Sequence, residues 1–332
     1  MNKATSKVPQ NRLKDDIIQK GELMQKLSII VPCYNEEKAL PLFFVEIDKY
    51  SKELAEQVEY VFVNDGSKDN TLNVLKSIKE EYPNQDIKIV DFSRNFGKEA
   101  GILAGLKTST GDYVVIMDAD MQDPPFLLPR MLETIKTEEY DSVATYRVDR
   151  KGEPPIRSFF ARKFYQLINR ISEVDIVDGS RDYRLMTRNM VDAIISLTEY
   201  HRFSKGIFVW VGFKTKYIEF ENVERIAGET KWSFWKLFKY AIEGIVAFTT
   251  FPLRISIFFG MTISLLSFLY MLFVMVKALL YGDPVAGYPS MMVVILFLGG
   301  IQMLSLGVLG EYLAKTYMEV KKRPNYIIKK IH

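Results

Sequence analysis

The sequence predicts an α/β domain with a mostly parallel sheet, followed by amphipathic helices and a hairpin of two membrane-spanning helices. Short apolar runs alternate with helix-like segments from residue 26 to residue 147, which is the pattern of right-handed βαβ units. Two C-terminal runs, residues 255–280 and 290–310, carry one charged residue between them, Lys277. Each run is long enough to cross the hydrocarbon core of a bilayer.

The composition excludes several classes of protein. The chain has 332 residues and a net charge of +3, so it lacks the strong basic field expected of a nucleic-acid-binding protein. One cysteine excludes an internal disulfide and fits a reducing compartment, and two histidines argue against a histidine-based zinc site or triad. Residues 1–25 are polar and lack the apolar core of a signal peptide, so we expect a flexible N-terminal segment.

The predicted sheet begins with four buried strands, each followed by a helix. We expect these strands at residues 27–31, 58–64, 87–92 and 114–117. Pro32 should end the first strand, and Asn35, Glu36 and Glu37 should start the helix after it. The second helix should run through about residue 81, and the third should begin at about Lys98.

Polar residues follow each of these strands, and parallel sheets bind ligands outside the carboxyl ends of their strands. We expect four polar clusters on this edge: residues 32–36, 64–67, 93–98 and 118–122. The absence of a Gly-x-Gly-x-x-Gly or Walker-type loop argues against a dinucleotide oxidoreductase and a P-loop enzyme. Gly97, Gly101 and Gly105 recur every four residues, which we interpret as close packing of a helix on the sheet.

The stretch VVIMDADMQDPP, residues 114–125, carries the most acidic of these clusters. Asp118, Asp120 and Asp123 are crowded together with Gln122 among them, and crowded carboxylates repel one another unless a cation lies between them. A divalent cation with oxygen ligands, Mg²⁺ or Mn²⁺, would relieve the repulsion and hold a diphosphate. Taken alone, the short Asp-x-Asp pattern fits a plain acidic loop better, so the surrounding sequence has to decide.

The second half of the chain is less regular. A further strand is expected at residues 141–146, ending in Arg147. Residues 156–171 form an amphipathic helix with aromatic and cationic side chains, which suits either a membrane surface or a plain contact with the core. Asp178, Asp182 and Arg184 precede another helix, and residues 231–253 form a second amphipathic segment, which we expect at the membrane interface.

The two apolar runs are joined by a short connector without lysine or arginine, whereas both outer flanks are rich in these residues. By the positive-inside rule the domain, the basic tail at residues 314–332 and both termini are cytoplasmic. The two spans, about residues 255–280 and 290–312, then form a hairpin in the plasma membrane. Gly299, Gly300, Gly307 and Gly310 offer surfaces for close helix packing, so we expect homo-oligomers.

Several motifs follow one another in a recognisable order: VPCYNEE, VNDGS, SRNFGKEAG, MDADMQDPP, DYRLMTR, RFSKGIFVWVGF and ERIAGETKW. Together they resemble the family 2 glycosyltransferases of the GT-A fold over about residues 26–320, with the transferase domain at residues 26–230. More narrowly, they resemble polyprenyl-phosphate glycosyltransferases of the GtrB and dolichol-phosphate mannose synthase type. The resemblance implies metal-dependent transfer of a sugar, with inversion, from UDP-glucose or UDP-N-acetylglucosamine to undecaprenyl phosphate. It also favours a tetramer.

The resemblance implies a role for most of the polar residues on the ligand edge. The residues implied to bind the nucleotide sugar are Pro32, Tyr34, Asn35, Glu36, Asp65, Lys98, Asp118 and Asp120. Asp120 and Gln122 would ligate the metal, and Asp123 would only shape the turn before Pro124. Asp118 and Asp182 are the implied catalytic carboxylates, with Asp182 either a base or a group that orients the sugar. Alternatively, Asp182 caps the helix after Leu185.

The acceptor phosphate requires cations near the membrane plane, and an arginine fork suits a phosphate well. Arg147 is the first candidate because it ends a strand on the ligand edge. The other candidates are Arg157, Arg162, Lys163, Arg202, Arg225 and Lys231, the last three because they match basic positions of the family. The chain departs from the family pattern at Arg181, which adds a charge beside Asp182, and at Trp232.

Two other functions remain open at this point. A processive polysaccharide synthase is disfavoured because the chain lacks a Gln-x-x-Arg-Trp segment and has few spans to enclose a polymer. A membrane scaffold with a degenerate transferase domain is disfavoured by the intact Asp118, Asp120 and Gln122.

Overall fold

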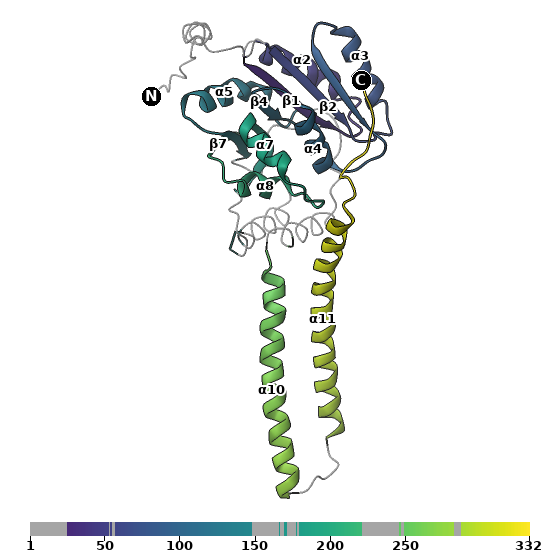
Figure 1. The fold of residues 1–332 in the computed structure, drawn as a ribbon, viewed down its shortest axis with the longest axis vertical. Helices are drawn as coiled ribbons and strands as arrows, with labels where there is room; N and C mark the ends of the chain where they lie inside the picture. Colours follow the sequence, from purple (N-terminus) through teal and green to yellow (C-terminus); the bar gives the residue numbers. More distant parts are fainter. Residues whose placement is uncertain are drawn as a thin grey trace, which may run out of the picture.

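A globular α/β domain is joined to two long helices that extend together from one end of it (Figure 1). The computed structural model describes residues 25–52, 54, 57–147, 166, 169–170, 177, 179–220, 246, 249–281 and 287–332. The expected N-terminal segment and most of the two amphipathic segments therefore lie outside the described residues.

A mixed sheet of eight strands forms the centre of the domain, in the order β7-β5-β6-β4-β1-β2-β3-β8. The strands are β1 (Lys26–Cys33), β2 (Gln57–Asn64), β3 (Asp86–Phe92), β4 (Tyr113–Ile116), β5 (Ser142–Arg147), β6 (Ser180–Thr187), β7 (Thr215–Phe220) and β8 (Ile328–Ile331). Strands β4, β1, β2 and β3 are parallel neighbours, which confirms the predicted βαβ units. Strand β6 pairs antiparallel with both β4 and β5, and β8 pairs antiparallel with β3.

Helices cover both faces of the sheet. They are α2 (Leu40–Ser51), α3 (Thr71–Glu81), α4 (Lys98–Thr108), the 3₁₀ turn η1 (Pro125–Leu127), α5 (Leu128–Thr137), α7 (Arg188–Ser196) and α8 (Ser204–Trp210). Apolar residues of α2, α3 and α5 form one core with the sheet, and those of α4, α7 and α8 form another on the opposite face. This three-layer arrangement buries both faces of the parallel strands, as their continuous apolar sequences require.

The first helix begins later than predicted. Helix α2 starts at Leu40 rather than at residues 35–37. The backbone N–H groups of residues 35–37 donate instead to side-chain oxygens of the next loop, on Ser67, Thr71 and Asp69, at 3.0, 2.8 and 3.3 Å. These bonds tie the β1–α2 loop to the β2–α3 loop, so the helix can form only after the chain leaves this contact.

The glycines of α4 allow the helix to lie close to the sheet, as predicted. A Cβ atom on Gly105 would lie 2.1 Å from Cγ2 of Ile30, and one on Gly101 would lie 3.3 Å from Cβ of Pro32. Pro32 does not end β1, because the strand continues to Cys33 and Pro32 pairs with Val63 of β2.

Strand β6 was not predicted, because the sequence around Asp182 was interpreted only as the approach to a helix. The strand lies between β4 and β5, with Ile116 opposite Arg184 and Tyr113 opposite Thr187. Helix α7 begins at Arg188, after Thr187 at its N-cap position. The alternative in which Asp182 caps this helix is therefore wrong.

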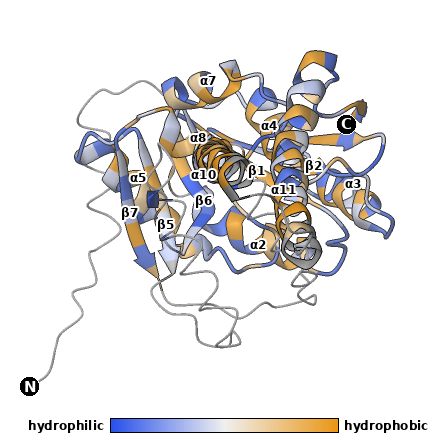
Figure 2. Cartoon of the chain, turned by 90° about the horizontal axis from the view of Figure 1, so that it is seen from below, coloured by the Kyte–Doolittle hydropathy of each residue, from blue (hydrophilic) through white to orange (hydrophobic). Residues whose placement is uncertain are grey.

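Helices α10 (Phe251–Tyr281) and α11 (Tyr288–Lys321) form the predicted hairpin (Figure 1). Within them, the segments Phe251–Tyr270 and Phe297–Lys321 are long and apolar enough to cross a membrane. Large apolar side chains along both helices are exposed, and the turns of α10, seen end-on in Figure 2, are mostly orange. Such an exposed apolar surface is unfavourable in water and suits a lipid environment.

The C-terminal tail returns to the domain and extends the sheet. After α11, the tail forms β8 against β3, and the ring of Tyr326 stacks on Phe92 at 5.0 Å. Asn325 Nδ2 donates to the backbone carbonyls of Glu199 and Tyr200 at 3.1 and 2.9 Å. The basic tail expected from the sequence therefore includes the end of a helix and an edge strand, which join the hairpin to the domain at a second point.

Candidate active site

The polar clusters expected on the ligand edge lie together at the carboxyl ends of β1, β2, β3 and β4. The β1 and β2 loops are joined through Asn35, whose Oδ1 accepts the backbone N–H of Lys68 at 2.9 Å. Asn35 adopts a positive φ of 56°, a left-handed conformation that asparagine tolerates better than most residues. These loops form the side of the site where the sequence predicts the nucleotide.

Asp65 organises the β3–α4 loop. Its carboxylate accepts hydrogen bonds from the backbone N–H groups of Phe96 and Gly97, at 2.6 and 2.9 Å, and from Asn95 Nδ2 at 2.9 Å. Burial raises the pKa of Asp65, and the two backbone N–H groups oppose this shift. Gly66 is required here, because a Cβ atom would lie 2.3 Å from the carbonyl carbon of Arg94.

The acidic loop at residues 118–123 is held in shape by its own side chains. Asp120 Oδ1 accepts the backbone N–H of Gln122 at 3.1 Å, and Asp123 Oδ2 accepts that of Asp118 at 2.9 Å. Met121 between them has a positive φ of 61°. Asp123 is completely buried. It therefore anchors the loop, which is more than the turn-shaping role that the sequence predicted.

Lys98 joins the two predicted catalytic carboxylates. Its Nζ lies 2.7 Å from Asp118 Oδ1 and 2.6 Å from Asp182 Oδ2, so strand β6 brings Asp182 to the acidic loop. Burial lowers the pKa of Lys98, but the two carboxylates raise it by more. Burial raises the pKa of Asp182, but Lys98, Lys205 and Arg181 lower it well below its usual range. Both groups are therefore charged at neutral pH.

Arg181, the departure from the family pattern, points into the same cluster. Its Nε and Nη2 lie 3.1 and 3.0 Å from Asp123 Oδ1, and its Nη2 lies 3.9 Å from Asp118 Oδ2. Burial lowers the pKa of Arg181, and Asp123, Asp118 and Asp120 raise it by more. The added charge thus contacts the acidic loop directly.

Glu99 was missed by the sequence analysis. Its carboxylate accepts hydrogen bonds from the backbone N–H of Ser204, at 3.0 Å, and from the Ser204 hydroxyl. Burial and the nearby Asp182 raise the pKa of Glu99 to about 7, although Ser204 and Lys98 oppose the shift. Its only signal in the sequence was its place next to Lys98, because Ser204 is distant along the chain.

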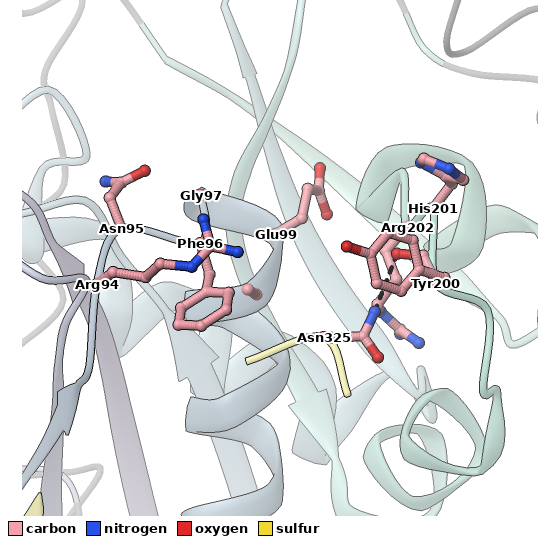
Figure 3. A pocket seen from close by; sticks show the side chains of 10 residues that line it. Arg94, Asn95, Phe96, Gly97, Glu99, Tyr200, His201, Arg202 and Asn325 are labelled. Atoms are coloured by element: carbon pink, nitrogen blue, oxygen red, sulfur yellow. Dashed lines mark hydrogen bonds between the residues drawn. The ribbon is translucent and has the colours of Figure 1, made fainter. Parts of the chain in front are cut away.

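A hollow of about 380 Å³ adjoins Glu99, between the β3–α4 loop and residues 200–202. Figure 3 shows Glu99 between these two walls, with Asn325 of the tail below. The guanidinium of Arg94 lies over the ring of Phe96, 4.4 Å from its centre. The tail therefore contributes a wall beside the site.

Most of the predicted acceptor residues cannot be placed. Arg147 lies at the end of β5, although its side chain is not described, and five others lie outside the described residues: Arg157, Arg162, Lys163, Arg225 and Lys231. Arg202 is described, and it donates to the backbone carbonyls of Leu197 and Ile194 at 2.8 and 3.2 Å. Its side chain is 3% exposed. Arg202 therefore caps the end of α7 in this structure, and its role as an acceptor ligand stays a prediction.

The donor atoms of the acidic loop fit a divalent cation. Within the described part of the chain, no group of three or more histidine, cysteine, aspartate or glutamate side chains converges on a possible metal position. Mg²⁺ and Mn²⁺ sites in nucleotide-dependent enzymes commonly use one or two protein oxygens, and the substrate phosphates supply others. Asp120 and Gln122, which lie on one turn of the loop, match this smaller set.

The family follows from comparison of the whole sequence. The Glycosyl transferase family 2 profile matches residues 28–195, half of the chain, and the GtrB C-terminal hairpin profile matches residues 251–316. The protein belongs to glycosyl transferase family 2 and has a GT-A-type domain followed by a GtrB-type hairpin. This family assignment is the one that the sequence motifs predicted.

Two relatives match almost throughout. The chain is 42% identical over 306 residues to the prophage bactoprenol glucosyl transferase homolog of Escherichia coli strain K12, which covers 92% of this chain and 99% of the relative. It is 44% identical over 303 residues to the putative glycosyltransferase CsbB of Bacillus subtilis strain 168, covering 91% of each. A solved glucosyl-3-phosphoglycerate synthase of Mycobacterium tuberculosis, in complex with Mn²⁺, UDP and phosphoglyceric acid, is 16% identical. That alignment has a TM-score of 0.48 and covers 73% of this chain and 82% of the synthase.

Proposed function

We propose that this protein transfers glucose from UDP-glucose to undecaprenyl phosphate, with inversion, at the cytoplasmic face of the plasma membrane. The observation that carries the proposal is the cluster of Asp118, Asp120, Lys98 and Asp182 on a domain that is joined to the hairpin at two points. The names of the bactoprenol glucosyl transferase relatives support both the sugar and the lipid. UDP-N-acetylglucosamine is the alternative donor.

The chemistry required of the chain is mainly positioning and charge stabilisation. A divalent metal held by Asp120 and Gln122 would take up negative charge on the leaving diphosphate. The nucleophile is a phosphate oxygen that is already anionic, so no strong base is needed. The low pKa of Asp182 makes it a weak base, which favours its role in orienting the sugar. Lys98 holds Asp182 and Asp118 close to each other, so that both carboxylates can face the same sugar.

The acceptor side and the topology extend this proposal. We propose that Arg147 and the predicted basic residues outside the described segments hold the phosphate of the lipid, near the membrane plane. We also propose that the domain and both termini are cytoplasmic, which the basic flanks of the hairpin support through the positive-inside rule.

Oligomerisation through the hairpin forms part of the same proposal. A Cβ atom on Gly299, Gly300, Gly307 or Gly310 would meet no atom within 4 Å, so these positions face open space along α11. Small residues on an exposed helix allow a second helix to approach closely in a membrane. We propose that this surface packs against other copies of the chain, in a tetramer. Native mass spectrometry from lipid nanodiscs should show tetramers, and active monomers would contradict any requirement for assembly.

A donor screen tests the reaction. The full chain in nanodiscs that contain undecaprenyl phosphate is incubated with radiolabelled UDP-glucose, UDP-N-acetylglucosamine or GDP-mannose, with Mg²⁺ or Mn²⁺. We expect a lipid-extractable monosaccharide from UDP-glucose, and the β configuration at its anomeric carbon by NMR. Lys107→Gln, which changes an exposed residue of α4 away from the cluster, serves as the matched active control. Failure with every donor would refute the proposal, and growth of a polymer would favour a processive synthase.

A further inference from the structure

Arg181 links strand β6 to the acidic loop through two nitrogen atoms. Both Nε and Nη2 contact Asp123 Oδ1, and the other oxygen of Asp123 accepts the backbone N–H of Asp118. The side chain of Arg181 is 19% exposed, and that of Asp123 is 1% exposed. Separating a pair as buried as this is unfavourable, because it would leave a buried charge without its counter-ion.

The position of Arg181 also affects the charge of the loop. Asp118, Asp120 and Asp123 lie within one stretch of six residues. Ionised carboxylates this close together repel one another, which destabilises the loop. Lys98 contacts both Asp118 and Asp182 and balances part of their negative charge from one side. Arg181 approaches Asp123 and Asp118 from β6, so the loop is partly neutralised before any metal arrives.

We propose that Arg181 is a permanent counter-cation of the acidic loop, whose positive charge lowers the affinity of the loop for a divalent cation by more than its contacts with Asp123 raise it. Arg181 acts through Asp123 and Asp118, so it is a positioning residue. The inference deepens the proposed function and rests on it. We therefore expect the metal to bind tightly only together with a nucleotide diphosphate, because the negative charge of the diphosphate offsets the positive charge of Arg181.

A purely mechanical role makes the opposite prediction about metal affinity. If Arg181 only anchors the loop through Asp123, its removal loosens the loop and weakens metal binding. If Arg181 supplies charge, its removal leaves the carboxylates more negative and strengthens metal binding. The sign of the change in Mn²⁺ affinity therefore separates the two roles.

The experiment measures Mn²⁺ binding by calorimetry on the purified full chain, without nucleotide and with UDP, together with the midpoint of thermal unfolding in EDTA and in Mn²⁺. Arg181→Gln should bind Mn²⁺ roughly tenfold more tightly without nucleotide. The midpoint of thermal unfolding of this variant should lie below that of the wild type in EDTA and return to the wild-type value in Mn²⁺. The increase in Mn²⁺ affinity on adding UDP should be smaller in this variant than in the wild type. Lys107→Gln removes one charge from the exposed end of α4 and should behave as wild type.

Arg181→Lys is the second variant, because it keeps the charge and loses the paired contact with Asp123. It should keep the Mn²⁺ affinity of the wild type within about threefold, whereas an anchoring role requires weaker binding. Unchanged or weaker Mn²⁺ affinity in Arg181→Gln would overturn the inference and leave the proposed function intact. If Arg181→Gln does not fold, weaker binding in Arg181→Lys overturns it. A wild type that binds neither Mn²⁺ nor UDP would overturn both.

Discussion

Charged clusters built around buried carboxylates lie at opposite ends of the parallel strands, and they differ in how the negative charge is balanced. At the amino ends, the carboxylate of Glu59 contacts Lys26 at 3.4 Å, together with Lys88 and the hydroxyl of Ser28. The backbone N–H of Thr110 donates to the same carboxylate at 2.8 Å. The Thr110 hydroxyl donates to it as well, at 3.0 Å. The Glu59 carboxylate is thus surrounded by two cations and three further donors, and Lys26 also contacts Asp86 at 3.0 Å.

At the carboxyl ends, several carboxylates share few cations. Within the described residues, Lys98 and Arg181 contact three aspartates between them: Asp118, Asp123 and Asp182. The pKa of one fully buried carboxylate at each end differs in direction, although Lys98 lowers the pKa of Asp182 within the crowded cluster. Burial raises the pKa of Glu59, but its partners lower it to about 2, whereas burial raises the pKa of Asp123 to about 6 despite Arg181. We interpret the Glu59 cluster at the amino ends as structural. The aspartate cluster at the carboxyl ends is where a cationic or polar ligand would bind most favourably.

The largest effect should come from Asp120. Asp120→Ala removes a proposed metal ligand, so transfer should fall by at least about 100-fold, while the circular dichroism spectrum stays that of the wild type. Asp123→Ala should instead lower the free energy of unfolding by roughly 3 kcal/mol, because it leaves Arg181 largely buried without its partner. Urea titration measures this loss. Equal transfer by Asp120→Ala and wild type would show that the acidic loop holds no essential ligand.

Lys98→Met should reduce transfer by about 100-fold, since Asp118 and Asp182 would lose the cation that joins them. The pKa of Asp182 should rise toward its usual range, which carboxyl-labelled NMR can follow. Lys88→Met makes the matched change at the other end of the sheet, beside Glu59. It should affect stability and leave the rate of transfer near that of wild type. A similar loss of transfer in both variants would show that the two clusters do not differ in their importance for transfer.

Glu59→Gln should destabilise the domain by roughly 3 kcal/mol at pH 7, with turnover of the folded enzyme unchanged. Because the folded-state pKa of Glu59 lies below its unfolded value, its ionisation contributes stability above pH 4.5. That contribution is lost as the pH falls toward about 2. The difference between variant and wild type should therefore shrink in urea titrations at pH 3. A constant difference would mean that hydrogen bonding rather than charge stabilises the cluster.

The smallest effect on transfer is expected where the C-terminal tail packs on β3. This strand supplies Lys88 to one cluster and leads into the loop held by Asp65 at the other. Tyr326→Ala removes the ring stacked on Phe92 and should lower the free energy of unfolding by about 1–2 kcal/mol. Since Asn325 and β8 also hold the tail, we expect transfer to fall less than about threefold. A large loss of transfer would show that the tail controls the carboxyl-end cluster.

The local sequence was sufficient for the elements that depend on periodicity. Continuous apolar runs predicted β1 to β4, and the glycine spacing of α4 predicted its close packing on Ile30. Two long apolar runs with a single charged residue predicted the hairpin, because length and composition decide whether a helix is able to cross a bilayer. The ordered motifs predicted the family.

Contacts between distant segments were decided only by the tertiary structure. Strand β6 enters the sheet antiparallel to β4 and so brings Asp182 and Arg181 to the acidic loop, and the tail returns to pair with β3. Asp65 is used to hold the β3–α4 loop, and Arg202 caps α7. The contacts of β6, the tail and Asp65 leave no local pattern, because each joins groups that are far apart along the chain, and Arg202 reaches back only five to eight residues but uses carbonyls that no motif marks. The sequence alone therefore determined the family, the order of the early strands and the acidic loop, whereas folding determined which charges surround that loop.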